Sequence, residues 1–338
     1  MWLKGNLHTH TTLSDGDLPP EEVCRSYADQ GYHFISITDH ERYFGQEDLR
    51  HASGRKAAPK HSDKHGDCDG LLLIPGQEIS ISSEDEPTMP LHVNGFGIGG
   101  PLTVERGPTK IETLQNCIDA VIAGGGIAQI NHPNFYYAFD HTHMIQTRNA
   151  RLIEVYNGHP LVNNLGDEDH IGVEQMWDRL LSSGMLIYGT AVDDSHHFTG
   201  ELGPRRANPF RGWIWVKTKA LTTREVLRAL VTGDFYASTG VELEDVYVDA
   251  WTLHVIVRPP STSSGWTTGS GQAQDGVRFV TRFIGDGGEA LKSSRKPHST
   301  FNMRGDGSRT YVRAKVIASD GTCAWTQPRL IPAFWRST

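Results

Sequence analysis

Short apolar segments alternate with helix-like segments over the first 240 residues of the chain. The apolar segments predict strands at 2–7, 34–38, 71–79, 92–98, 127–131, 152–157, 186–192 and 212–217. Amphipathic patterns between them predict helices at 19–30, 109–123, 172–183 and 222–233. Strands that alternate with helices over this length predict an α/β domain with a parallel sheet, closed as a barrel.

Beyond residue 240 the pattern changes to strands without intervening helices. The predicted strands lie in VYVDAWTLHVIVRP, VRFVTRFIG, TYVRAKVIAS and a last segment near 324–331. Polar loops are predicted at 51–70, which is charged, and at 259–276, which is rich in glycine and serine. We therefore predict a barrel domain at 1–240 and a small antiparallel, sandwich-like β-domain at 241–338.

Composition narrows the class of protein. The 338 residues are 37% hydrophobic and 21% charged, as in ordinary soluble proteins, and the net charge of −8 argues against nucleic-acid or anionic-membrane partners. No apolar run approaches the roughly 20 residues of a membrane span. The chain enters a predicted strand without a leader, which favours a cytoplasmic location. Four scattered cysteines predict neither a disulfide framework nor a thiolate zinc site.

The stretch GNLHTHTTLSDG at 5–16 carries the first candidate chemistry. His8 and His10 lie two residues apart in an extended run that continues from the strand predicted at 2–7, so their side chains face the same side. Imidazoles are good metal ligands and poor core material. The pair therefore predicts a metal site at the start of the chain.

Further histidines and acids lie at or near the ends of predicted strands. They are Asp15, Asp39, His40, Glu78, His92, His132, Asp193, Asp194, His196 and His197. Loops at the carboxyl ends of parallel strands converge on one rim, so we expect these side chains to lie close together. They exceed the roughly four to six ligands of one ion. The set predicts two or three divalent ions, with Glu78 bridging; zinc, manganese and iron fit the ligands alike.

The motifs HTHTTLSDG, ITDH, GQE, INHP and DDSH resemble the successive motifs of the PHP (polymerase and histidinol phosphatase) family. The resemblance covers about 1–240 and implies a distorted (β/α)7 barrel that binds up to three metals at its carboxyl-terminal rim. The segment RGWIWVKTKALTTREVLRALVTGDFYASTG is similar to the PHP branch named for carbaryl hydrolase, in which a β-domain follows the barrel.

The resemblance also implies which residues hold each metal. His8, His10, Glu78 and Asp194 would hold the first ion, Glu78, His92 and His132 the second, and Asp15, His40 and His196 the third. The DxH spacing selects Asp194 with His196, which leaves Asp193 to orient an imidazole. Asp39 is expected to support the site or the fold.

The predicted reaction is hydrolysis. Divalent ions roughly 3.5–4 Å apart can share a hydroxide and clamp an anionic oxygen. The sequence has no GxSxG elbow, phosphate loop or dinucleotide fingerprint. We therefore expect a metal-dependent phosphoesterase that hydrolyses a small mono- or diester through a metal-bound hydroxide. No nucleic acid or membrane partner is expected, and the sequence leaves the oligomeric state open.

Residues that contact the substrate are harder to assign. Arg42 could reach an anionic group or remain solvated, and His159 could protonate a leaving group or cap its loop. His197 and Arg206 are candidates for lining the substrate. His141 and His143 copy the HxH spacing, but we expect them to be surface residues of a loop.

Three alternatives stay open. Hydrolysis of a carbamate or carboxylic ester is favoured if Phe135, Tyr136 and Tyr137 form an aromatic wall. A metal-stabilised binding module is less favoured, because every expected ligand position is filled. In the β-domain, tryptophans could bind polysaccharide, although aromatic residues of small sandwiches are more often core; they are Trp251, Trp266, Trp325 and Trp335. A proofreading exonuclease lacks support, since the chain is acidic and no polymerase region follows.

Overall fold

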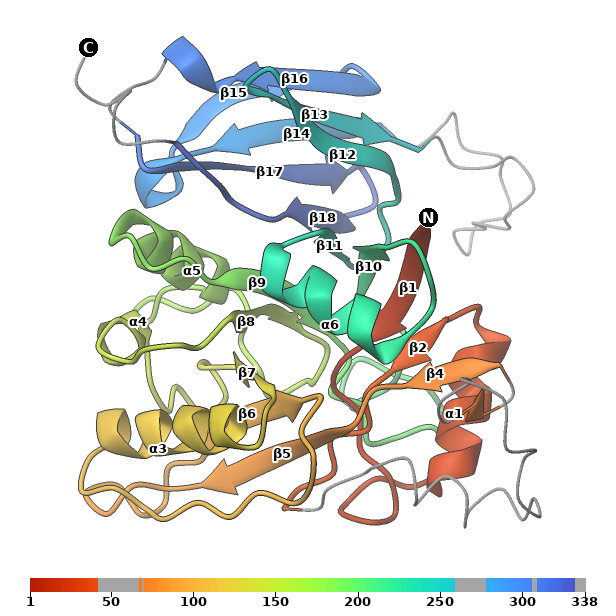
Figure 1. The fold of residues 1–338 in the computed structure, drawn as a ribbon, viewed down its shortest axis with the longest axis vertical. Coiled ribbons are helices and arrows are strands. Elements are labelled where there is room, and N and C mark those ends of the chain that lie inside the picture. The colour runs from red at the N-terminus through yellow and green to blue at the C-terminus, as the bar shows by residue number, and fades with distance from the viewer. Residues whose placement is uncertain (42–66, 69, 259–277, 306–308, 332–338) are drawn as a thin grey trace. The chain divides into compact units, whose positions relative to one another are not determined.

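The computed structural model describes residues 1–41, 67–68, 70–258, 278–305 and 309–331, and the chain forms two compact units, Met1–Ala237 and Ser238–Thr338 (Figure 1). Arg42, a candidate substrate residue, lies outside the described residues. So do Trp266 and Trp335, which were candidates for binding polysaccharide. Within the described part of the chain, no helix is both long and apolar enough to cross a membrane.

The first unit contains two sheets. In one, the strand order is β11-β10-β1-β2-β4-β3, and in the other it is β5-β6-β7-β8-β9. The strands of the first are β1 (Trp2–Asn6), β2 (Phe34–Ile35), β3 (Asp67–Cys68), β4 (Leu71–Leu73), β10 (Trp213–Lys217) and β11 (Phe235–Ser238). Those of the second are β5 (Gly76–Ile81), β6 (Leu91–Phe96), β7 (Ile127–Ile130), β8 (Leu152–Asn157) and β9 (Tyr188–Val192).

The sheets are mixed, so the prediction of a purely parallel sheet was wrong. β1 pairs with β2, and β7 with β8 and β8 with β9, in parallel, but β6 is antiparallel to both β5 and β7. The short connection at 82–90 has no helix, and a parallel crossover needs a dozen or more residues. β6 therefore folds back on β5 as a hairpin.

The two sheets do not close into a continuous barrel within the described residues. Isolated parallel bridges join them, Thr9 with Ser195 and His40 with Glu78. The mixed α/β class is confirmed, and the (β/α)7 barrel stays a prediction.

One predicted strand, 71–79, is in fact two. β4 belongs to the first sheet and β5 to the second, and the chain crosses between them at Ile74 and Pro75. Pro75 has no N–H for a ladder, and its carbonyl accepts from the backbone of Gly97 at 2.7 Å. This crossing brings Glu78 of β5 beside His40, which follows β2.

The helices lie close to their predicted positions. They are α1 (Pro20–Asp29), α3 (Lys110–Ala123), α4 (His141–Met144), α5 (Val173–Ser182) and α6 (Thr223–Thr232). Thr109 and Thr222 cap α3 and α6 by accepting the backbone N–H groups of Glu112 and Glu225. α3 lies along β6 and β7 (Figure 1). The single turn α4 was not expected; Asp140 caps it.

A compact apolar core fixes α1 against the first sheet. Val23, Cys24 and Tyr27 of the helix are fully buried with Ile35 and Leu73. Their spacing of three and four residues places them on one helix face. The packing holds the loop between β1 and α1, which carries His8, His10 and Asp15.

The second unit is an antiparallel β-domain. One sheet has the order β12-β13-β16, and the other runs β15-β14-β17-β18, with β19 paired to β17. The strands are β12 (Leu243–Asp249), β13 (Thr252–Val257), β14 (Phe279–Ile284), β15 (Ala290–Ser294), β16 (His298–Asn302), β17 (Tyr311–Ala318), β18 (Cys323–Thr326) and β19 (Arg329–Leu330). Phe283 of β14 stacks on Phe301 of β16 at 5.5 Å.

Two features of this unit differ from the sequence prediction. VYVDAWTLHVIV forms a hairpin, because Ala250 and Trp251 adopt left-handed backbone angles (φ 42° and 72°) between β12 and β13. β15 and β16 were missed, since the segment ALKSSRKPHSTFN is polar and lacks a clear alternation.

Candidate metal centre

The predicted ligands converge on Glu78, whose side chain is 1% exposed. Its Oε2 faces His8 Nε2 at 3.1 Å, His10 Nε2 at 3.2 Å and His40 Nδ1 at 3.2 Å. Its Oε1 faces His92 Nδ1 at 3.1 Å and His132 Nε2 at 3.5 Å. Strands from both sheets thus direct imidazoles to one carboxylate.

Asp194 provides a second buried carboxylate. Its Oδ1 lies 3.3 Å from both His8 Nε2 and His10 Nε2, and its Oδ2 lies 3.8 Å from His132 Nε2. Asp194 has φ +50°, a left-handed angle that is uncommon for a non-glycine residue and typical of functional sites. The turn after β9 thereby aims this side chain at the imidazoles.

Asp15 provides a third carboxylate, which is exposed to solvent. Its Oδ1 lies 3.3 Å from His196 Nε2 and 3.5 Å from His10 Nδ1, and its Oδ2 lies 3.8 Å from His40 Nε2. The Asp15 side chain is 56% exposed. The ligands implied for a third metal are therefore neighbours, at the side of the cluster open to solvent.

The outer nitrogens of several imidazoles are held by hydrogen bonds. His8 Nδ1 bonds Glu154 Oε1 at 2.7 Å, and His92 Nε2 bonds Ser80 Oγ at 2.9 Å. His196 Nδ1 donates to the carbonyl of Asp194 at 3.0 Å. A ring nitrogen that donates outward leaves the lone pair of the other nitrogen directed inward, the arrangement typical of metal-bound histidine.

Sequence reasoning missed Glu154 of β8, which is 1% exposed. Besides His8, it accepts from Gln129 Nε2 at 3.0 Å, from the backbone N–H of His132 at 2.9 Å and from Asn157 Nδ2 at 2.9 Å. The sequence signal that could have found Glu154 is an acid within the otherwise apolar segment LIEVY. A buried carboxylate without partners costs folding free energy, so such an acid indicates polar partners in the core. Glu154 orients His8 and fixes the loop that carries His132.

Neighbouring charges and burial shift the pKa values of the clustered side chains in opposite directions. Burial alone would lower the pKa of His10, but the hydrogen bonds that it donates to Asp194 and Glu78 raise it to about 9. Burial alone would raise the pKa of Glu78, but His8, His92 and His40 hold it well below its usual range. Burial lowers the pKa of His40 to about 4. The carboxylates are thus ionised at neutral pH, which is the form that binds cations.

These residues fit divalent metals by their chemistry and arrangement. Four groups have ligand atoms within 4.8 Å of one another. They are His10, Asp15, His40 and His196; His8, His10 and Asp194; His8, His132 and Glu154; and His40, Glu78 and His92. The buried His40 Nδ1 has no hydrogen-bond partner among the described residues, although it faces Glu78. An imidazole nitrogen of this kind is well suited to a cation.

Asp39 and Asp193 support the loops of the site. Asp39 accepts from the backbone N–H and hydroxyl of Thr11, at 2.7 and 2.6 Å, and from the Ser14 hydroxyl at 2.5 Å. It fixes the segment between His10 and Asp15, in line with the supporting role predicted for it.

The prediction that Asp193 orients an imidazole does not hold in the described structure. Its carboxylate accepts from the backbone N–H groups of Phe210, Arg211 and Gly212 at 2.6–2.9 Å and from Tyr27 Oη at 2.8 Å. Consecutive side chains at the end of a strand face opposite ways, so the two carboxylates meet different partners. Asp193 therefore anchors the loop that follows, and Asp194 faces the cluster.

His159 lies beside the cluster. Its ring centre is 5.5 Å from that of His196, and its Nδ1 accepts from the backbone N–H of Leu161 at 3.2 Å. The imidazole thus caps its loop through one nitrogen. Burial lowers its pKa to about 4.

The other predicted substrate residues lie in the loop after Asp194. Arg206 donates to the carbonyl of Thr199 at 3.1 Å and lies 3.9 Å from Asp17. The ring of His197 is 6.4 Å from that of His196, and its buried Nδ1 has no hydrogen-bond partner among the described residues. Their contacts with a substrate stay a prediction.

The histidines of α4 lie apart from the candidate ligand groups. His143 Nδ1 bonds Asp140 Oδ1 at 2.8 Å and so closes the cap of this helix. The HxH spacing at His141 and His143 therefore falls on one helical turn, whereas His8 and His10 follow a strand.

Comparison with known proteins is consistent with this site. Residues 6–158 match the PHP domain family. The chain is 30% identical over 80 residues to the DNA polymerase/3′-5′ exonuclease PolX of Bacillus subtilis, a match that spans 23% of this chain and only 14% of that protein.

Two solved structures are similar at low identity. One is a two-domain protein from Bacteroides vulgatus containing a predicted PHP-like metal-dependent phosphoesterase, with 18% identity, a TM-score of 0.47 and coverage of 97% of this chain and 95% of that one. The other is a putative metal-dependent phosphoesterase from Bifidobacterium adolescentis, with 15% identity, a TM-score of 0.39 and coverage of 60% and 89%. The family match rests on residues 6–158, the segment that supplies Glu78 and most imidazoles of the candidate centre: this part of the chain is similar to PHP domains.

Proposed function

We propose that the protein is a metal-dependent hydrolase of a small phosphate mono- or diester, with two or three divalent ions at the cluster. The observation that carries the proposal is the convergence of His8, His10, His40, His92 and His132 on the buried carboxylate of Glu78. Phosphoester chemistry is supported by the PHP match and by a relative that is named as an exonuclease.

The four ligand groups suggest how the ions are shared. Glu78 and Asp194 each face imidazoles of more than one group and would bridge, while Asp15 faces imidazoles of one group and would belong to one ion alone. Bound divalent ions would supply Lewis acidity toward the phosphoryl oxygens and lower the pKa of water. Zinc, manganese and iron all suit the ligands.

His159 is placed to assist the leaving group. Because its Nδ1 accepts from Leu161, its neutral form carries the proton on Nε2. The ring adjoins both His196 and Phe135. We assign His159 Nε2–H the role of hydrogen-bond donor to the leaving oxygen.

Carbamate or carboxylic ester hydrolysis is the second candidate, and a specific observation favours it. The ring of Phe135 lies 5.2 Å from His132 and 5.7 Å from His159, and Tyr136 follows it with a 57% exposed side chain. Tyr136 and Tyr137 both have left-handed backbone angles (φ 51° and 53°). Phe135 and Tyr136 form an aromatic edge that would suit an aryl ester, whereas Tyr137 turns away and stacks on His170.

Metal content and hydrolysis, measured on the same samples, test the proposal. Wild type and Glu78→Gln would be compared by plasma mass spectrometry and with p-nitrophenyl phosphate, bis-p-nitrophenyl phosphate and a p-nitrophenyl carboxylic ester. Asp29→Asn, an exposed carboxylate of α1, is the matched control.

We expect two to three metals per wild-type and control chain, and loss of both metal and phosphoester hydrolysis in Glu78→Gln. Preference for the carboxylic ester would support the second candidate. At most one metal, with no turnover after reconstitution with zinc, manganese or iron, would contradict both.

A further inference from the structure

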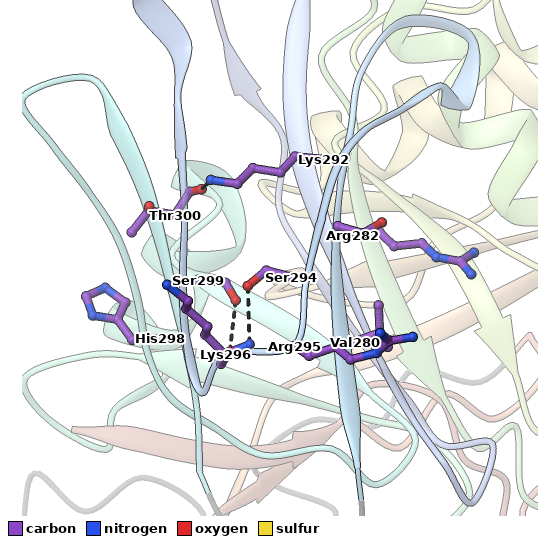
Figure 2. A pocket seen from close by; sticks show the side chains of 10 residues that line it. Val280, Arg282, Lys292, Ser294, Arg295, Lys296, His298, Ser299 and Thr300 are labelled. Atoms are coloured by element: carbon purple, nitrogen blue, oxygen red, sulfur yellow. Dashed lines mark hydrogen bonds between the residues drawn. The ribbon is translucent and has the colours of Figure 1, made fainter.

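The second unit contains an open pocket of about 840 Å³ that is lined by basic side chains (Figure 2). Its lining comprises Val280 and Arg282 of β14, Lys292–Ser294 of β15, the turn residues Arg295 and Lys296, and His298–Thr300 of β16. Neither aspartate nor glutamate is among these lining residues. A pocket of this size and charge contrasts with a chain of net charge −8.

The turn between β15 and β16 is held in place by hydrogen bonds on both sides. The backbone N–H of Lys296 donates to Ser294 Oγ at 3.2 Å, and Ser299 Oγ donates to the Lys296 carbonyl at 2.9 Å (Figure 2). Lys292 Nζ donates to the carbonyl of Thr300 at 2.7 Å and so links β15 to β16. The basic side chains thus stand on a fixed frame, which reduces the entropy cost of binding.

Three cationic side chains of the pocket have no carboxylate partner among the described residues. Among the described residues, no carboxylate lies within ion-pair distance of Arg282, Arg295 or Lys296, whereas the neighbouring cations Arg258 and Arg309 pair with Glu242 and Glu289. The strand register also sets Arg282 directly opposite Lys315. Like charges opposite each other on a sheet are destabilising. An anionic ligand in the pocket would compensate the charges of Arg282, Arg295 and Lys296.

His298 adds an imidazole to the lining of the pocket. Its Nε2 lies 2.9 Å from His254 Nδ1, and His254 stacks on Tyr247 at 4.6 Å. In Figure 2, the side chains of Arg282 and Arg295 extend to one side of the turn between β15 and β16, and those of Lys296 and His298 extend to the other.

We propose that this pocket of the second unit binds a small polyanion that carries phosphate or sulfate groups. Arginine and lysine side chains with serine hydroxyls are the donors that recognise such groups. The volume falls in the range of pockets for small ligands, roughly 300–1,000 Å³, and exceeds what one tetrahedral anion fills. The acidic chain argues against a nucleic acid as the ligand. The lining of this pocket shares no residue with the metal centre, and the proposal does not depend on the proposed hydrolysis.

Calorimetric titration of the full-length protein tests the proposal. The metals would be stripped with a chelator, and the chelator removed by dialysis, so that the cluster of the first unit does not bind the probes. The probes are tripolyphosphate, a sulfated heparin disaccharide and citrate. The test variant is Arg295→Gln/Lys296→Gln, and the matched control is Arg278→Gln/Arg304→Gln, which removes the same charge from exposed positions of the same unit outside the lining.

We expect saturable binding of tripolyphosphate or the disaccharide that weakens as salt rises and falls by about tenfold or more in the test variant. The control should bind as wild type does. The preferred probe would distinguish a phosphorylated from a sulfated ligand. Equal weakening in both double variants, binding of citrate alone, or binding of no probe would overturn the proposal. Unchanged melting temperatures would establish that the variants are folded.

Discussion

The candidate metal centre has an inner part and an outer part that differ in exposure. The inner carboxylates Glu78 and Asp194 have side chains only 1% and 7% exposed, whereas the outer carboxylate Asp15 is 56% exposed. Electrostatic interactions are stronger where water is excluded. We therefore expect inner ligands to hold metal tightly, and Asp15, with His40 and His196, to hold an ion that exchanges with solvent.

After Glu78→Gln, the largest effect is expected for Asp194→Asn. This change removes the charge that faces His8, His10 and His132 while keeping the side-chain volume. We expect metal affinity and turnover to fall by more than about a hundredfold, beyond the loss typical of residues that merely support ligands. Mass spectrometry and phosphoester turnover would measure it, with Asp29→Asn as control. Retention of full metal content would contradict a role as inner ligand.

Glu154→Gln should have the next largest effect. The amide cannot accept as strongly from His8 Nδ1, so the imidazole loses its fixed orientation. Metal affinity should fall by about ten- to a hundredfold, the range for such supporting carboxylates. A competition titration with a chromogenic chelator would measure it. If affinity fell as far as in Asp194→Asn, Glu154 would instead be a direct ligand.

Asp15→Asn should have a smaller and selective effect. An exposed carboxylate contributes less binding energy, so we expect about tenfold weaker binding of one ion and no change in the others. Metal counts at a series of free-metal concentrations would show a single weakened step. Loss of all ions together would remove the distinction between the inner and outer parts.

Asp17→Asn should have the smallest effect on metal binding and act mainly on stability. Burial would raise the pKa of Asp17, but hydrogen bonds from Phe198 and Thr199 lower it below 3.8. A carboxyl whose pKa is lower in the folded state stabilises the protein above its unfolded pKa, and this contribution is lost as pH falls through the folded value. The wild type should melt above the variant near neutral pH. That difference should be constant above about pH 5 and shrink below about pH 4. A difference that instead grew in acid would contradict the assignment.

Sequence patterns predicted the elements of the first unit well, because periodicity reports which faces of a strand or helix are buried. The patterns predicted one strand where a single apolar run in fact contains two. At 71–79 and at 246–257 the run contains a turn, at Pro75 and at Ala250–Trp251, and the pattern does not show which sheet each half joins. The pattern also does not show the direction of strand pairing. The side chains of β6 alternate between the two faces of the sheet whether β6 is parallel or antiparallel to β5.

For the site, residue type and position after strands predicted the set that surrounds Glu78, because histidines and acids are poorly suited to apolar strand ends without a partner. Glu154 was missed because it lies inside β8. Asp193 was assigned the wrong contact because the backbone N–H groups of Phe210, Arg211 and Gly212, which its carboxylate accepts, are brought beside it by long-range packing.

The sequence by itself determined the candidate ligands, their order along the chain and the α/β character of the first unit, since these follow from residue chemistry and local periodicity. Tertiary structure alone decided which oxygen faces which imidazole, which carboxylate is buried, and that Lys292, Arg295 and Arg282 share a pocket. Distances between residues far apart in the chain arise from long-range packing, which local patterns do not encode.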